Sequence, residues 1–142
     1  HDDVAPVVVS GPEDLSVQCY DDVPAIDLAS VIATDNCQVV GIVASDMIDG
    51  NECVATITRT YTVSDGCGNS TVYVQVIMVN DNIAPVITQG PENMTVACAD
   101  EIPAADISLI VASDNCSDVT VSVAGFSCMN CRFSGLFEAA TY

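Results

Sequence analysis

The chain has 142 residues, half of them hydrophobic, and its 20 acidic residues face only two basic ones, so the net charge is −18. This charge excludes nucleic acid as a partner, because almost nothing in the chain could neutralise phosphates, and it disfavours an anionic membrane surface. No apolar run reaches the roughly 18 to 20 residues that a membrane helix needs, so we expect no membrane insertion. Because the chain starts at His1 without a signal peptide or an initiator Met, we expect a processed chain or an excerpt from a longer protein.

The pattern of apolar residues predicts strands and turns along the chain. No stretch of helix length shows 3.6-residue periodicity, so we expect an all-β protein. In chain order, the first half should contain strands at residues 4–9, 15–19 and 37–45, a further short strand at 28–33, and a turn at 46–52.

The clearest pattern is that of a long hairpin. Residues 56–64 alternate Thr with apolar or aromatic residues, and residues 70–79 alternate in a similar way. Such alternation is typical of a strand with one buried face. Between them, residues 65–69 (Asp-Gly-Cys-Gly-Asn) offer two glycines for positive φ and two side chains that can hydrogen-bond the backbone. The hairpin should supply the last two strands of a domain.

The sequence then repeats itself. Residues 2–47 align with residues 81–126 without a gap at a constant offset of 79, and 18 of the 46 aligned positions are identical. A repeat of this length is a small domain rather than a solenoid unit. We expect a complete domain at residues 1–80 and a second, incomplete one at residues 81–142, whose segment 126–142 departs from the pattern. The predicted fold class is all-β, with tandem immunoglobulin-like (Greek-key) β-sandwich domains that carry disulfides.

The second copy lacks a counterpart of the hairpin. Without it, residues 119–124 should present an unpaired edge and uncovered apolar side chains, and such edges are normally paired or covered. Residues 126–142 are too few, and too poor in alternation, to replace the hairpin. Two explanations stay open: the chain continues beyond Tyr142 in the natural protein, or a neighbouring chain donates strands, as pilus subunits do.

Eight cysteines beside a single histidine predict disulfides in an oxidising compartment rather than zinc sites. Cys19 ends one predicted strand and Cys37 begins another, and both should lie at the same end of the sandwich. We therefore predict a Cys19–Cys37 bond and, by the repeat, a Cys98–Cys116 bond. Closing a loop of this length stabilises a fold by roughly 3 kcal/mol in the chain-entropy model.

The other four cysteines have no settled partners. Cys53 and Cys67 would pair by elimination, but a straight strand at 56–64 would hold them roughly 30 Å apart, which is beyond the reach of a disulfide. Either that strand is broken, or Cys53 pairs elsewhere, with a neighbouring repeat or another chain. Cys128 and Cys131 form a CxxC motif without the βαβ setting of a redox site and without further ligands for zinc, so we expect structural disulfides there.

Carboxylate and amide side chains cluster at the predicted turns. In a sandwich, Glu13, the 46–52 turn and residues 80–82 should meet at one end, facing the next repeat. Calcium takes about six to eight oxygen ligands from such groups, so calcium is the candidate cofactor. Two plainer explanations compete: Asp and Asn are common turn formers, and acidity keeps an extracellular surface soluble. The candidate calcium ligands are Glu13, Asp46, Asp49, Asp81 and Asn82.

The sequence shows no catalytic constellation. The histidine is the terminal residue, so His-based triads are effectively excluded, and no glycine-rich phosphate loop is present. A pair of carboxylates could act as in glycosidases, but nothing in the sequence places one in a cleft. We therefore expect no enzymatic activity.

Several motifs resemble a known family. Residues 35–37 (DNC), residues 58–69 (TRTYTVSDGCGN), and Asp81 ahead of residues 84–86 (APV) look like the hyalin-repeat (HYR-like) domains. They are most similar to the cysteine-bearing versions strung in tandem in giant surface and adhesion proteins of Bacteroidetes-type bacteria. The resemblance covers the first repeat and the second to about Gly125. It implies an immunoglobulin-like sandwich, an extracellular place at the cell surface, and a role in adhesion or as a stalk, without catalysis.

Two functions fit these observations. The first is a stalk segment of a giant cell-surface adhesin, one excerpt of a long tandem array. The second is a subunit of an extracellular filament or sheath that assembles end to end, with strand donation as one route. In both, the expected partners are other copies or neighbouring repeats, together with an unknown surface ligand. A stalk segment should be monomeric in solution, whereas a filament subunit should polymerise.

Overall fold

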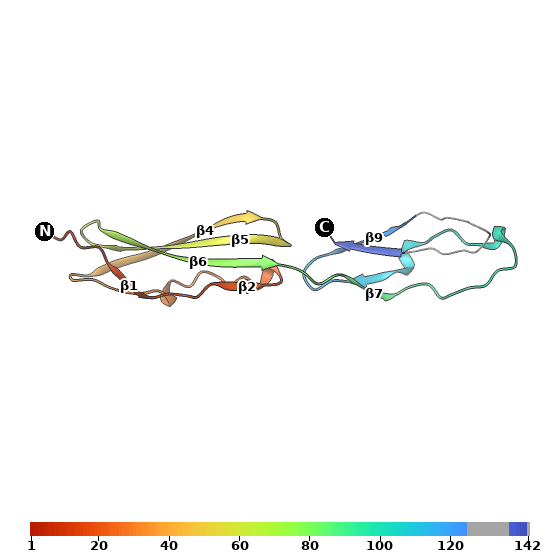
Figure 1. Cartoon of the computed structure of the whole chain (residues 1–142), viewed down its shortest axis with the longest axis horizontal. Helices are drawn as coiled ribbons and strands as arrows, with labels where there is room; N and C mark the ends of the chain where they lie inside the picture. Colours follow the sequence, from red (N-terminus) through yellow and green to blue (C-terminus); the bar gives the residue numbers. More distant parts are fainter. Residues whose placement is uncertain (125–136, 142) are drawn as a thin grey trace. The chain divides into compact units, whose positions relative to one another are not determined.

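The computed structural model describes residues 1–124 and 137–141 (Figure 1). In these residues all regular structure is β-strand or short 3-10 helix, which confirms the predicted all-β class. The chain forms two compact units, His1–Asp81 and Asn82–Tyr142. None of the described helices combines the length and the apolar character needed to cross a membrane.

The first unit is a sandwich of two sheets. Its strands are Val7–Ser10 (β1), Leu15–Val17 (β2), Ile32–Thr34 (β3), Val39–Gly50 (β4), Val54–Asp65 (β5) and Ser70–Asn80 (β6), and its 3-10 helices are Tyr20–Asp22 (η1) and Leu28–Ser30 (η2). The larger sheet has the order β2-β6-β5-β4, in which β2 runs parallel to β6 and the other neighbours are antiparallel. The smaller sheet pairs β1 with β3. Apolar side chains of both sheets meet between them, which agrees with the predicted sandwich.

The predicted hairpin is confirmed as β5 and β6, which pair over their full length. The carboxylate of Asp65 closes the turn between them. Its Oδ1 accepts hydrogen bonds from the backbone N–H groups of Cys67, Gly68 and Asn69 at 2.8, 2.8 and 2.9 Å. Gly68 has a φ of 98°, a conformation that glycine adopts without steric strain. The glycine and the acidic residue in the turn therefore have the roles that the sequence predicted.

Alternation along β5 builds the core. Ile57, Tyr61 and Val63 are almost fully buried, whereas the intervening Thr residues lie on the opposite face of the strand. Ile57 packs with Ile77 in one cluster, and Tyr61 and Val63 pack with Val31 and with apolar side chains of β1 and β3 in a second cluster. Each such side chain stabilises the fold by about 1.5 to 3 kcal/mol. The strand is thus the central element of the first unit.

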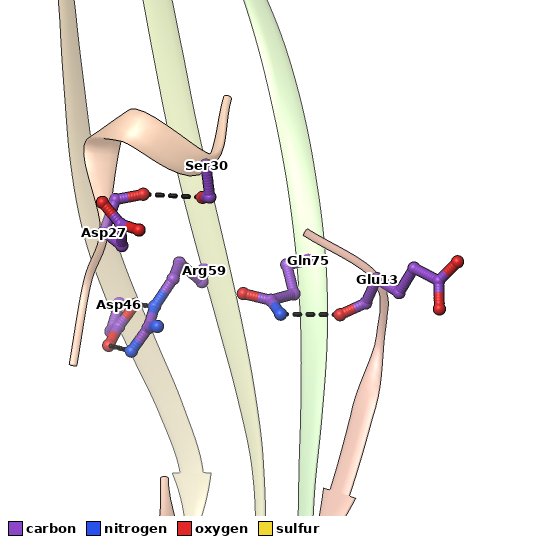
Figure 2. Close-up of polar contacts among 6 residues, drawn as sticks. All are labelled: Glu13, Asp27, Ser30, Asp46, Arg59 and Gln75. Atoms are coloured by element: carbon purple, nitrogen blue, oxygen red, sulfur yellow. Dashed lines mark hydrogen bonds and ion pairs between the residues drawn. The ribbon is translucent and has the colours of Figure 1, made fainter. Parts of the chain in front are cut away.

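A row of polar side chains crosses the unit at the middle of the large sheet (Figure 2). Arg59 is 3% exposed and donates from Nε and Nη2 to the two carboxylate oxygens of Asp46, at 2.8 and 2.9 Å. Its cross-strand neighbour Gln75 donates from Nε2 to the carbonyl oxygen of Glu13 at 2.6 Å. The guanidinium therefore has the bidentate carboxylate partner that a buried charge requires. The hydrogen bond from Gln75 to Glu13 holds the loop before β2 against β6.

The predicted turn at residues 46–52 is wrong for most of its length. Residues 46–50 continue β4, because their backbone groups stay paired with β5 to the end of the strand. The chain reverses only after them, where the Asn51 side chain accepts hydrogen bonds from the N–H groups of Cys53 and Val54, both at 2.9 Å. Acidic residues in this segment were therefore a poor indicator of a turn.

The strand predicted at residues 28–33 is replaced by η2 followed by β3. Asp27 precedes the helix, and its Oδ1 accepts a hydrogen bond from the N–H of Ala29 at 3.0 Å. This cap satisfies a backbone donor that a single turn of helix leaves without an internal partner. An Asp at the start of a short apolar segment thus favours the helical turn over an extended strand.

The second unit repeats the smaller sheet of the first. Its elements are Val86–Gln89 (β7), Ala99–Glu101 (η3), Ile107–Leu109 (η4), Val111–Ser113 (β8), Val119–Val123 (β9) and Phe137–Thr141 (β10). In the β7–β8 pair Val86 lies opposite Ser113, and in the β1–β3 pair Val7 lies opposite Thr34, so the register is the same at an offset of 79. Both pairs carry an irregularity at the same place. The internal repeat is therefore present in the backbone as well as in the sequence.

The segment expected to lack a partner strand has one in its own chain. β9 pairs antiparallel with β10, from Val119 opposite Thr141 to Val123 opposite Phe137. The prediction of an unpaired edge at residues 119–124 is therefore wrong, because the region after residue 126 supplies a strand that the sequence pattern did not indicate. β10 lies beside β9 as β5 lies beside β4. Cys128 and Cys131 lie outside the described residues.

Candidate functional site

The residues predicted to bind calcium do not all gather at one end of the sandwich. Asp46 lies in the middle of β4, where both of its oxygens are bonded to Arg59 (Figure 2). Glu13 lies on the same cross-strand row, because its carbonyl oxygen is bonded to Gln75. Asp49 is exposed, three residues further along β4. The predicted convergence is therefore wrong for Glu13 and Asp46.

Asp81 and Asn82 lie where the first unit ends and the second begins. The backbone N–H of Asp81 donates to the carbonyl oxygen of Cys53 at 2.8 Å, just beyond the end of β6. Nothing in these contacts brings Asp81 towards the middle of β4. A calcium site made by these residues stays a prediction.

Carboxylates gather instead around Asp2, at the end of the first unit that holds the β5–β6 turn. One potential ligand atom from each of Asp2, Asp35 and Cys37 lies within 4.8 Å of the others. The Oδ1 atom of Asp2 accepts hydrogen bonds from the Asn36 amide and from the N–H of Val4, both at 3.1 Å. These bonds, with that of Asn36 first, hold the pKa of Asp2 below its ordinary value. Asp35 accepts from the N–H of Cys37 at 2.9 Å, as in an Asx turn.

The β5–β6 turn joins this group through Asn69. Its Nδ2 donates to the carbonyl oxygen of Asp2 at 3.2 Å and to Oδ2 of Asp65 at 2.7 Å. The Asn69 side chain, followed by the backbone N–H groups of the turn, holds the pKa of Asp65 below its ordinary value. Three segments far apart in sequence therefore meet in what we call the Asp2 cluster, which comprises Asp2, Asp35, Asn36, Cys37, Asp65 and Asn69.

The Asp2 cluster contains oxygens that are not satisfied within the described part of the chain. Oδ2 of Asp2 and Oδ1 of Asp35 are buried in the cluster without a hydrogen-bond partner. In the second unit the same holds for Oδ2 of Asp114, which is the counterpart of Asp35. Such oxygens would accept water or a cation. Two carboxylates do not by themselves define a metal site, because Asx turns assemble the same groups.

Sequence reasoning placed Asp65 and Asn69 in a turn and Cys37 at the start of a strand, but it did not bring the members of the Asp2 cluster together. The signal that could have found the cluster is the pairing of β4 with β5. Val39 lies opposite Asp65, so the residues just before β4 lie next to the residues just after β5. That register depends on a twelve-residue β4, whereas the sequence pattern predicted a shorter strand.

The structure changes the predicted disulfides. Cys19 and Cys116 each take part in a disulfide, whereas Cys37 and Cys98 are free thiols in the described part of the chain. The predicted Cys19–Cys37 and Cys98–Cys116 bonds are therefore wrong. Cys53 is also free.

The reason is that Cys19 and Cys37 lie at opposite ends of the first unit. β2 runs beside the last part of β6, with Val17 opposite Val79, so Cys19 follows at the end of the unit where β6 ends. Cys37 precedes Val39, which lies opposite Asp65 at the other end. Between the two cysteines the chain travels the length of the sandwich through η1, η2 and β3. The prediction placed both strand ends at one end because it did not allow for this crossing.

Cys53 and Cys67 flank the two ends of β5. This strand is unbroken over 12 residues, so its ends lie roughly 36 Å apart at about 3.3 Å per residue. The geometric objection to a Cys53–Cys67 bond is confirmed, and both cysteines are free. Each end of the first unit therefore holds two cysteines, Cys19 and Cys53 at one end and Cys37 and Cys67 at the other.

This arrangement of four cysteines on a β-sandwich agrees with the comparison with known families. Residues 7–79 match the family described as "HYR-like domain with 4 cysteines". The match spans just over half of the chain and includes Cys19, Cys37, Cys53 and Cys67. The chain belongs to this HYR-like family. Comparison with curated proteins found no match, and neither did comparison with solved structures. Membership indicates a repeat domain of the extracellular, adhesion type.

Proposed function

We propose that the chain is a structural segment of the stalk of a giant cell-surface adhesin, in which HYR-like repeats follow one another outside the cell. The observation that carries the proposal is an HYR-like match at residues 7–79 together with a second copy of the same backbone elements at an offset of 79. Repetition of a small domain builds length, and length is what a stalk provides.

The path of the chain through the first unit supports this role. Asp2 lies beside the β5–β6 turn, while Asp81 lies just beyond β6 and beside Cys53. These places are at opposite ends of β5, roughly 36 Å apart at about 3.3 Å per residue. A domain that the chain enters at one end and leaves at the other adds its own length to an array.

The proposed role needs no catalysis. Buried polar side chains such as Arg59, Gln75 and Asp65 make contacts that hold strands, loops and turns in place. A strongly acidic surface keeps such a segment soluble and separate from other acidic surfaces. The proposed partners are neighbouring repeats, with a surface ligand bound elsewhere in the full protein.

A subunit of an extracellular filament or sheath is the second candidate. The observation in its favour is an uncharged part of the outer face of β4, β5 and β6, which ends before Asp49 and in which Val43 and Met47 are 64% and 68% exposed. In a chain of net charge −18, two copies would meet with least repulsion through such a face. Its cross-strand rows are Val43–Thr62–Val72, Ser45–Thr60–Val74 and Met47–Thr58–Val76.

The mass of the purified chain in solution separates the two candidates. A stalk segment should give the mass of one chain, 14.7 kDa, in light scattering across a range of protein and salt concentrations. High salt is the sharper condition, because it screens the repulsion between acidic chains. Growth of the mass with concentration would favour the filament instead. The variant Thr60→Glu, which adds a charge to the centre of the outer face, should then restore the monomer, whereas Asp21→Glu on η1 should not.

A further inference from the structure

Two free thiols lie at the same end of the first unit. Cys37 and Cys67 are both exposed, and Cys67 stands in the β5–β6 turn. Val39 of β4 lies opposite Asp65 of β5. Cys37 is two residues before Val39, and Cys67 is two residues after Asp65, so both cysteines lie just past the same end of the β4–β5 pair.

The Asp2 cluster holds both cysteine backbones in place. The N–H of Cys37 donates to Asp35 at 2.9 Å, and the N–H of Cys67 donates to Asp65 at 2.8 Å. Asp2 joins the two turns, because its side chain accepts from Asn36 and its carbonyl oxygen accepts from Asn69. The hydrogen bond and charge of Asp2 raise the pKa of Cys37, followed by burial, the charge of Asp35 and, last, the charge of Cys67.

We propose that Cys37 and Cys67 form a disulfide that joins the loop before β4 to the β5–β6 turn. The bond closes a loop that contains β4, β5 and the turn between them. It rests on the proposed extracellular place, because cytosolic thiols are kept reduced.

The oxidant would be a small disulfide such as oxidised glutathione. The thiolate of Cys67 attacks one glutathione sulfur, forms a mixed disulfide and expels glutathione thiolate. The thiolate of Cys37 then attacks the Cys67 sulfur and expels the second glutathione thiolate. Two protein thiols are oxidised, one glutathione disulfide is reduced, and the two thiol protons pass to the leaving thiolates through water.

Peptide mapping of the full 142-residue chain tests the bond. The reduced chain is oxidised in a glutathione buffer, its remaining thiols are alkylated, and it is cut without reduction by a protease that cleaves after acidic residues. Asp46, Asp49 and Glu52 lie between the two cysteines, so cleavage separates them unless the disulfide is present. The expected product is a pair of peptides joined through Cys37 and Cys67, with a mass two hydrogen atoms below their sum.

Two variants make the mapping specific. Cys67→Ser should abolish the joined pair and leave Cys37 alkylated or carrying glutathione. Cys53→Ser removes a thiol at the other end of β5 and should leave the pair intact. Either cysteine bonded to a different cysteine of this or a second chain, or both recovered as alkylated thiols after oxidation, would overturn the proposal.

Thermal unfolding gives a second measurement. The oxidised chain should melt on the order of 10 °C above oxidised Cys67→Ser, because the bond removes conformational freedom from the unfolded chain. Equal melting temperatures would contradict the proposed loop closure. Mapping and melting of the purified chain report whether the bond forms, whereas labelling of intact cells reports where the protein lies. The pairing and the proposed function can therefore fail separately.

Discussion

At the scale of single residues, a few contacts hold the loops of the first unit to the large sheet. Tyr73 and Gln75, side by side on one face of β6, donate hydrogen bonds to the carbonyl oxygens of Pro12 and Glu13 at 2.8 and 2.6 Å. The chain before β2 can lie this close because Gly11 has no side chain. A Cβ atom there would clash with the Tyr73 ring. Gly11 is therefore required for packing and not for its backbone angles.

Replacing Gly11 by Ala should destabilise the first unit by roughly 1 to 3 kcal/mol, because the added methyl group forces the Tyr73 ring or the loop to move. Urea unfolding followed by circular dichroism would measure the change. Gly41→Ala is the matched control, since a Cβ atom at that position meets nothing within 4 Å. Equal stability of the two variants would show that the Gly11 contact does not constrain the loop.

The Asp46–Arg59 pair makes a second prediction at this scale. Asp46→Asn should lower the free energy of unfolding by about 3 kcal/mol, because it leaves a buried guanidinium without its counter-charge. The double variant Asp46→Leu/Arg59→Met should recover most of this loss, because it buries no charge. A double variant as unstable as Asp46→Asn would contradict the claim that the loss comes from the unpaired guanidinium.

The pKa of Asp65 predicts how the hairpin turn responds to acid. Its pKa is lowered in the folded chain, so the charged turn contributes stability above the ordinary Asp value of about 4, and that contribution is lost as the pH falls through the lower folded value. In Asp65→Asn, stability should therefore fall less between pH 5 and pH 2 than in the unchanged chain. Chemical unfolding at several pH values measures this difference. Parallel curves for the two chains would contradict it, and Asp21→Asn, outside the turn, is the control.

At the scale of elements, the sequence predicted what local pattern and turn chemistry determine. The alternation of Thr with apolar residues placed β5 correctly, and the Asp-Gly-Cys-Gly-Asn segment placed the turn. The length of β4 was missed because residues 46–50 keep their strand pairing with β5 despite two acidic side chains. Arg59 on the neighbouring strand is the ion-pair partner of one of them, Asp46. The residue pattern of a single strand does not reveal a partner on another strand.

Strand pairing predicts an order of local stability in the first unit. β5 is paired on both sides and carries most of the buried side chains of the first unit, while β1 is four residues long and pairs on one side only, with β3. In hydrogen exchange the amides of Tyr61 and Val63 should therefore exchange only on global unfolding, and those of β1 by local opening. Equal protection of β1 and β5 would contradict this view of the sandwich.

At the scale of the whole molecule, the repeat and the fold class followed from the sequence, whereas the positions of the cysteines and carboxylates did not. The offset of 79 was visible residue by residue, and the backbone reproduces it. Which end of the unit holds Cys19 or Cys37 depends on β2 running parallel to β6, a long-range pairing without a local signature. The Asp2 cluster was missed for the same reason, because its three segments meet only through the full sheet.

The central claim is that this HYR-like chain is a structural segment of a stalk outside the cell. Electron microscopy of the native source material, with immunogold labelling by an antibody against residues 1–81, tests it most directly. The account predicts label on unpermeabilised cells, on thin projections from the cell surface. Label that requires permeabilised cells would contradict an extracellular place, and label repeated along free, continuous fibres would contradict the stalk and establish the filament.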